Sequence, residues 1–184
     1  MRKQKGFSLI ELLIVVAIIL IIAAIAIPNL LRARIAANDS AAASTIRTIN
    51  TAEVTYSTTY VSQGYSATLQ NLGPNGTTCV APTFTGACLL DDQVGCVGGA
   101  QCPKGGYNYF MTATAAVAPV PDYTASAGPF GNSTGSRNFC SNPDAVVRFN
   151  RSTTVLAAPE TLAGCATISA APNNDVAGQY QALQ

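Results

Sequence analysis

Residues 6–27 read GFSLIELLIVVAIILIIAAIAI, and this stretch contains the longest apolar run of the chain. From residue 7 to residue 27 it is almost wholly apolar, and a helix of this length spans roughly 30 Å, the thickness of a bilayer core. Three basic residues lie within residues 1–6, so the positive-inside bias places the N-terminus in the cytoplasm and the remainder outside. The arginines that follow the stretch weaken this bias without reversing it: Arg32, Arg34 and Arg47. We therefore expect residues 7–27 to anchor the chain in a membrane.

One long helix is expected over residues 7–63, because this range contains no glycine and a single proline, Pro28. Glu53 falls on an apolar face of its second half and is expected either at the margin of that face or beside a charged partner. Pro28 cannot donate a backbone hydrogen bond and is expected to bend the helix, either to let helices repack or as a tolerated kink. The apolar face is recognised by spacings of three, four and seven residues: Ile35, Ala42, Ile46, Ile49, Tyr56 and Tyr60.

Residues 64–184 are expected to form a globular head, since glycine and proline end the helical pattern from Gly64 onward. Short β-prone runs lie between turns at Tyr107–Thr114, Asp122–Ala127, Arg137–Ser141 and Ala145–Asn150. We expect a four-stranded antiparallel sheet packed on the helix, followed by an irregular tail over residues 157–184 held by Cys165. The fold class is therefore α+β. A long N-terminal helix, transmembrane in its first half and amphipathic in its second, packs against a small antiparallel sheet stapled by disulfides.

The composition excludes several classes of function. Histidine, the commonest general base and metal ligand, is absent. Lys+Arg number 10 and Asp+Glu 9, and a formal net charge of +1 gives no electrostatic reason to expect a nucleic-acid partner. Asp91 and Asp92 are interpreted as solvated loop charge and not as a calcium site, since two adjacent acids seldom suffice. We therefore expect no catalytic residue, no cofactor and no metal.

The 6 cysteines are expected to form disulfides, because an even count beyond an export signal is typical of chains that fold in an oxidising compartment. The alternative is a set of reduced or metal-binding thiols, but no CxxC pair supports a zinc site. Our hypothesis is that neighbours in the sequence pair, since they close the shortest loops. The pairs would be Cys79 with Cys88, Cys96 with Cys102, and Cys140 with Cys165.

Glu11 is the acidic residue within the apolar stretch, where a carboxylate can cost about 3 kcal/mol on insertion scales. Such a residue usually has a partner, yet no Lys or Arg lies between Lys5 and Arg32. Cleavage after Gly6 would give Phe7 a free α-amino group, largely cationic near neutral pH. Phe7 and Glu11 are four residues apart and share a helix face, and a neighbouring molecule could offer the same pair of charges. The alternative is an acidic residue that is tolerated near the membrane interface.

The order Gly6-Phe7-Ser8-Leu9-Ile10-Glu11, followed by the apolar run, resembles the cleavage and methylation motif of type IV prepilins. The resemblance implies a leader peptide over residues 1–6, removed after Gly6 by a prepilin peptidase, and N-methylation of Phe7. It also implies that Glu11 pairs with the amine of a neighbouring subunit in the filament. The resemblance is strong over residues 1–60. It is looser in the head, where Gly105–Tyr109 and Val146–Phe149 are similar to pilin strands.

A type IV pilin is a structural subunit and not an enzyme, so the resemblance implies a homopolymer built by pilus assembly machinery. The subunit would lie in the bacterial inner membrane before assembly and in an extracellular filament afterwards, with a role in adhesion, motility or DNA uptake. A pseudopilin of a type II secretion system shares the same N-terminal machinery and is one alternative. A secreted protein with an ordinary signal peptide, cut at the A-x-A site Ala24-Ile25-Ala26, is another.

Overall fold

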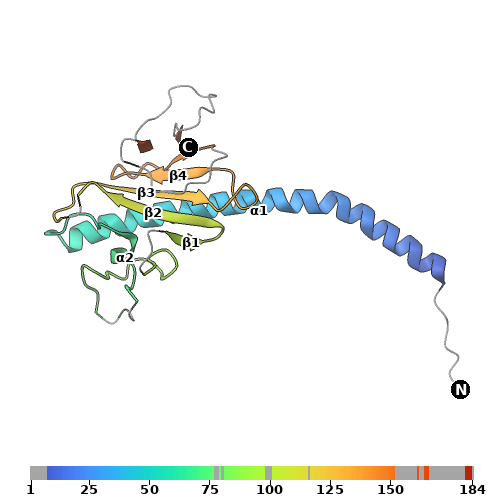
Figure 1. Cartoon of the computed structure of the whole chain (residues 1–184), viewed down its shortest axis with the longest axis horizontal. Helices are drawn as coiled ribbons and strands as arrows, with labels where there is room; N and C mark the ends of the chain where they lie inside the picture. The colour runs from blue at the N-terminus through green and yellow to red at the C-terminus, as the bar shows by residue number, and fades with distance from the viewer. Residues whose placement is uncertain are drawn as a thin grey trace, which may run out of the picture. The chain divides into compact units, whose positions relative to one another are not determined.

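The computed structural model of the chain describes residues 8–76, 79, 81–97, 101–115, 117–151, 161, 164–165 and 181–183. The chain divides into two compact units, Met1–Arg34 and Ile35–Gln184, and the first helix contributes one half to each of them. The elements follow in the order α1 (Leu9–Thr59), α2 (Leu69–Leu72), β1 (Cys102–Lys104), β2 (Tyr107–Ala113), β3 (Tyr123–Pro129), β4 (Asn138–Ser141), β5 (Arg148–Asn150) and β6 (Gln181–Ala182) (Figure 1).

The long N-terminal helix that the sequence predicts is present. Pro28 lies inside α1, which stays helical on both sides of it, so the proline does not end the helix. The helix ends at Thr59, four residues before the predicted boundary. The amide of Gln63 donates to the carbonyl oxygen of Tyr60 at 2.8 Å, which is a turn and no longer a helical bond.

Gly64 reverses the chain after α1. Its φ of 72° lies in the left-handed region that glycine adopts without a steric cost. The reversal is fixed by Val120, whose amide donates to the carbonyl oxygen of Gln63 at 2.8 Å and whose own carbonyl accepts from the amide of Tyr65 at 3.0 Å. An added Cβ on Gly64 would overlap the backbone of Val120, so the close approach of the two segments requires a glycine here.

The second half of α1 provides one wall of the core of the second unit. Ala42, Ile46, Ile49 and Tyr56 are buried as their spacing predicts, whereas Ile35 and Tyr60 lie at the margin. These side chains pack against aromatic residues of the sheet and against α2, and the largest contributors are Tyr107, Tyr109, Tyr123, Phe139 and Leu72. Full burial of such side chains is worth about 1.5–3 kcal/mol each, so this interface holds the helix to the head.

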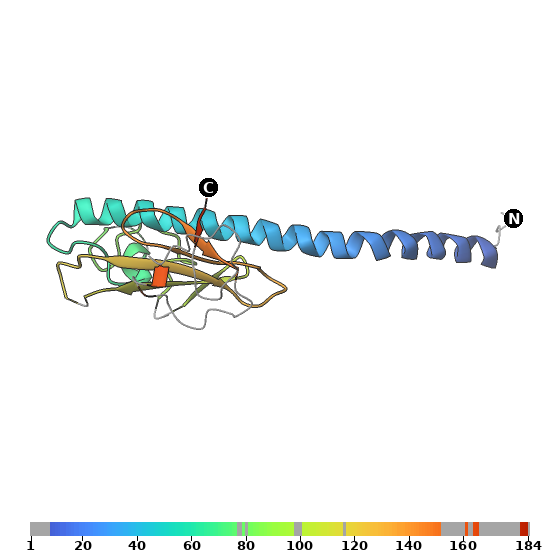
Figure 2. The ribbon, with the colours of Figure 1, turned by 90° about the horizontal axis from the view of Figure 1, so that it is seen from above.

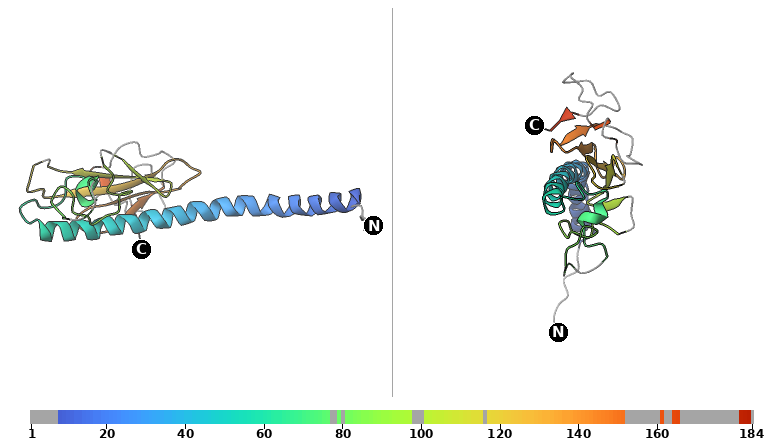
Figure 3. Two further views of the ribbon diagram at one scale, coloured as in Figure 1. Left: turned by 90° about the horizontal axis from the view of Figure 1, so that it is seen from below. Right: turned by 90° about the vertical axis from the view of Figure 1, so that its left-hand side faces the viewer.

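The sheet has six antiparallel strands in the order β1-β2-β3-β4-β5-β6, each paired with its neighbour in the sequence. It lies along one side of the second half of α1 (Figures 2 and 3). The four central strands are those predicted from the sequence. The expected four-stranded sheet is nevertheless too small, because short strands pair at both edges: Cys102–Lys104 with β2 and Gln181–Ala182 with β5.

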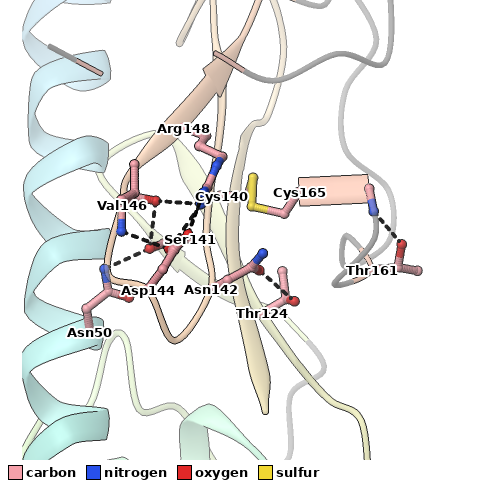
Figure 4. The surroundings of a disulfide bond; sticks show 11 residues. Asn50, Thr124, Cys140, Ser141, Asn142, Asp144, Val146, Arg148, Thr161 and Cys165 are labelled. Atoms are coloured by element: carbon pink, nitrogen blue, oxygen red, sulfur yellow. Dashed lines mark hydrogen bonds and ion pairs between the residues drawn. A yellow bond between two sulfur atoms is a disulfide. The ribbon is translucent and has the colours of Figure 1, made fainter. Parts of the chain in front are cut away.

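Three disulfides staple the second unit, and they pair cysteines that are neighbours in the sequence, as hypothesised. Cys79–Cys88 and Cys96–Cys102 close short loops before β2. Cys140 of β4 pairs with Cys165 over a sequence separation of 25, and both residues are fully buried (Figure 4). Much of the predicted tail over residues 157–184 lies outside the described residues. Its description as irregular is wrong at Gln181–Ala182, which form β6.

The expectation for Glu53 is also wrong. The residue is neither marginal nor beside a charged group: its side chain is fully buried, and its partner is the neutral residue Ser66. The amide of Ser66 donates to the carboxyl group at 2.9 Å, and the hydroxyl group of Ser66 donates to its other oxygen. The loop that follows α1 thus supplies two donors that replace water around the carboxyl group.

Candidate functional site

The candidate functional site is the exposed apolar half of α1. Every Leu, Ile and Val from Leu9 to Leu31 is exposed, and Leu9, Ile27 and Leu30 retain 79%, 66% and 70% of their accessible surface. A buried side chain of this type gains about 1.5–3 kcal/mol, so leaving the whole segment in water costs on the order of tens of kcal/mol. This segment therefore requires an apolar partner, either lipid or protein.

The length of the segment suits a membrane. By length and composition α1 qualifies as a membrane-spanning helix, and none of the residues in its most apolar window is buried. A soluble core helix would pass the same test of composition but would be largely covered by the rest of the chain. The uncovered window thus differs from the core helix of a soluble protein. The membrane anchor over residues 7–27, of which residue 7 lies outside the described residues, stays a prediction.

A shallow apolar groove runs along this half of the helix. Its lining residues recur every three or four positions, so they form one stripe of the helix surface: Leu9, Leu12, Leu13, Val16, Ala17 and Leu20. Grooves of this kind receive the side-chain ridges of a second helix. The segment can therefore pack against another apolar helix as well as against lipid.

Glu11 lies in the first turn of α1 and is exposed. Ser8 directly precedes α1, and its carbonyl oxygen accepts from the amides of Glu11 at 3.2 Å and of Leu12 at 3.3 Å. A carboxylate in the first turn interacts favourably with the positive end of the helix dipole. Gly6 and Phe7 lie outside the described residues, so the pairing of an amine on Phe7 with Glu11 stays a prediction.

The head holds polar residues that the sequence did not single out. Asp39 of α1 is buried and accepts hydrogen bonds from the hydroxyl of Tyr107 at 2.6 Å, from the amide of Ser136 at 3.1 Å and from the hydroxyl of Ser136 at 2.7 Å. Asp39 lies four residues after Ile35 and three before Ala42, and these spacings place it on the buried face of the helix. This spacing is the feature of the sequence from which its burial could have been predicted. Asp39 thereby ties the helix to the loop before β4.

Asn50 of α1 forms a second buried contact of this kind (Figure 4). Its amide nitrogen donates to the hydroxyl of Ser141 on β4 at 2.8 Å, and its carbonyl oxygen accepts from the hydroxyl of Tyr123 on β3 at 3.1 Å. Buried polar groups that are satisfied in this way fix one orientation of a helix against a sheet. We interpret Asp39 and Asn50 as structural ties.

Several ionisable groups of the head take part in structural contacts. Burial, together with the hydrogen bond to Asp39, raises the pKa of Tyr107, and burial raises the pKa of Tyr123, so both phenols stay protonated near neutral pH. The guanidinium of Arg148 holds the pKa of Asp144 below its usual range. Asp91 pairs with Lys104 and accepts from the amide of Val94 at 3.0 Å. Among the described residues, no three His, Cys, Asp or Glu are grouped so that they could hold a metal ion.

The N-terminal segment is similar in sequence to known proteins. Residues 1–27 match the family model of the prokaryotic N-terminal methylation motif. A stretch of 40 residues, 22% of this chain, is 70% identical to the type IV wide pilus major component PilA4 of Thermus thermophilus, and the match spans 30% of that protein's length. No solved structure matches the chain. The N-terminal segment of the chain thus carries the prokaryotic N-terminal methylation motif and is similar to the corresponding part of a type IV pilus component.

Proposed function

We propose that this chain is the precursor of a structural subunit of a type IV pilus, polymerised through its N-terminal helix. The carrying observation is the uncovered apolar half of α1, which bears a single carboxylate, Glu11, in its first turn. Glu11 lies within residues 1–27, which match the methylation motif. Both a membrane and a bundle of copies of the same helix would remove this apolar surface from water.

Cleavage of the precursor would create a positively charged partner for Glu11. A prepilin peptidase would cut after Gly6 and leave Phe7 with an N-methylated amino group. The cut also removes three basic residues, and the formal net charge changes from +1 to −2, since Lys+Arg fall from 10 to 7 against 9 Asp+Glu. A cationic amine on Phe7 of one subunit would pair with Glu11 of its neighbour, which would set the register between apolar helices.

The apolar half of α1 would lie first in the membrane and then in the filament. Before assembly it would anchor the subunit in the inner membrane, with the head on the outer side. Afterwards it would line the interior of an extracellular filament, where Pro28 would weaken the helix locally and let neighbouring helices repack. The partners are copies of the same chain, the peptidase and the pilus assembly machinery. The filament would serve in adhesion, motility or DNA uptake.

Substitution of Glu11 tests this function. We expect Glu11→Ala to leave the precursor in the membrane fraction, because the apolar helix is intact, and to abolish surface filaments seen by electron microscopy. Asp92→Ala is the matched control, since it removes an exposed carboxylate from the head and should leave filaments unchanged. Normal filaments built from Glu11→Ala would contradict the proposed pairing.

Deletion of the gene separates a pilus subunit from a pseudopilin of a type II secretion system, which has the same N-terminal machinery. Loss of surface filaments with normal protein secretion is the result expected for a pilus subunit. Loss of secretion with filaments intact would assign the chain to the secretion system instead.

A further inference from the structure

Two arginines follow the apolar half of α1 directly. Arg32 and Arg34 belong to the same unit as the apolar segment, and both side chains are exposed. Among the described residues, neither arginine takes part in an ion pair or a side-chain hydrogen bond. Basic residues on the translocated side of a membrane helix run against the positive-inside bias, so their presence here calls for a partner.

The spacing along the helix places these arginines at a defined depth. Leu12 to Leu31 are apolar except at Pro28 and Asn29, and this length at about 1.5 Å per residue matches the roughly 30 Å of a bilayer core. Glu11 then lies at one boundary of the hydrocarbon and Arg32 at the other. The guanidinium groups of Arg32 and Arg34 fall in the layer of lipid phosphates.

The angular positions of the two arginines distinguish lipid from a protein partner. Residues two apart on a helix of about 3.6 residues per turn point to nearly opposite sides. A single acidic group on a neighbouring helix would therefore meet only one of them. A phosphate layer surrounds the helix and meets both, and the planar guanidinium binds a phosphate through two parallel hydrogen bonds. The long side chains also allow the charge to reach the phosphates while their methylene groups stay near the hydrocarbon.

We propose that Arg32 and Arg34 bind the headgroup phosphates of membrane phospholipids on the outer side, and that they hold the anchor at a fixed depth before assembly. The proposal rests on the proposed function, since it requires the membrane-anchored precursor. If both arginines are replaced by alanine, the apolar run continues without a charge to Ala37. The helix is then free to move further into the bilayer.

The depth of a probe on Asn29 tests this directly. The full chain with Asn29→Cys, labelled with a polarity-sensitive fluorophore, is reconstituted at low protein density in phosphatidylethanolamine–phosphatidylglycerol vesicles. We expect Arg32→Ala with Arg34→Ala to shift the emission to shorter wavelength and to raise quenching by lipids brominated near the bilayer centre by about twofold. The disulfide-bonded cysteines do not react with the maleimide label under non-reducing conditions.

Two variants serve as controls. Arg32→Lys with Arg34→Lys keeps both charges and should keep the wild-type depth, because an ammonium group also binds phosphate. Arg47→Ala removes the same charge from the exposed face of α1 in the head and should leave the probe unchanged.

An unchanged depth in the double alanine variant would overturn the proposal, and it would also be the result if the arginines served only to bind a second copy of the chain. The proposed function is tested separately in the same vesicles, by extraction with alkaline carbonate. If carbonate extracts the wild-type chain from the vesicles, this result would contradict the membrane anchor. It would contradict the lipid contact as well, because that contact requires the anchor. Wild-type chain that resists carbonate while the double alanine variant stays at wild-type depth overturns only the lipid contact.

Discussion

The buried carboxyl group of Glu53 accepts two hydrogen bonds from Ser66, one from its amide at 2.9 Å and one from its hydroxyl. Glu53 lies near the end of α1, and Ser66 lies in the connection to α2. Burial raises the pKa of Glu53 from its ordinary 4.5 to about 7, although the hydrogen bonds from Ser66 oppose the shift. The titratable carboxyl group of Glu53 thus lies close to the C-terminal end of α1 and contacts the connection that follows the helix.

Glu53→Gln should remove a pH dependence from the stability of the head. The folded pKa lies above the unfolded one, so the contribution of Glu53 is most favourable below pH 4.5 and is lost as the pH rises to about 7. The loss amounts to about 3 kcal/mol at most. Glutamine cannot ionise, and its side-chain oxygen can still accept from Ser66. The free energy of unfolding of this variant should therefore change little over this range relative to wild type.

Urea unfolding of the full chain in detergent, between pH 4.5 and pH 7, provides the measurement. Tyrosine fluorescence reports on the head, since all 7 tyrosines lie in the second unit and tryptophan is absent. Asp92→Asn is the control, because Asp92 is an exposed acid whereas Glu53 is buried. Equal pH slopes for wild type and Glu53→Gln would show that Glu53 does not titrate in this range.

The three disulfides should differ in their contribution to stability. The Cys140–Cys165 bridge has a sequence separation of 25, against 6 for Cys96–Cys102. Chain entropy then predicts a loss of about 3.5 kcal/mol for Cys140→Ala with Cys165→Ala, and of about 2 kcal/mol for Cys96→Ala with Cys102→Ala. The same urea experiment compares the two. The reverse order would show that strain or residual structure outweighs the loop length.

Gly64→Ala should destabilise the head by about 2 kcal/mol or more, because alanine at a φ of 72° is strained and its Cβ would overlap the backbone of Val120. Gly131→Ala is the matched control: no atom lies within 4 Å of an added Cβ there, so the change should stay within about 0.5 kcal/mol. Thermal unfolding of both variants measures the difference. Equal midpoints would mean that the Gly64–Val120 contact does not constrain the chain.

The sequence predicted the features that depend on periodicity and composition. The buried face of α1 and the four central strands follow from apolar spacings of helical and strand period, which the core preserves. The disulfide pairs follow from loop length, since each bridge joins neighbours in the sequence. The outer strands could not be predicted, because Cys102–Lys104 and Gln181–Ala182 are too short to carry a period and are defined by their partners.

The polar contacts of the core also depend on partners distant in the sequence. The spacing of Glu53 places it on the apolar face, but its full burial and its neutral partner Ser66 were not predicted, since a serine in a loop carries no signal of its own. Asp39 and Asn50 share the spacing of that face, yet their role depends on Ser136 and Ser141, which only the folded sheet brings near. In the candidate site, the sequence predicted the apolar segment, because it is a local feature, whereas the role of Glu11 stays a prediction.

The mature N-terminus tests the central claim most directly. Mass spectrometry of the chain purified from cells should find a first residue of Phe7, one methyl group heavier than the unmodified residue. This result would establish the cut after Gly6 and the amine that Glu11 requires. A chain that begins at Ile27, after an ordinary signal peptidase cut, would have lost Glu11 and most of the apolar helix, and it would contradict both the anchor and the filament.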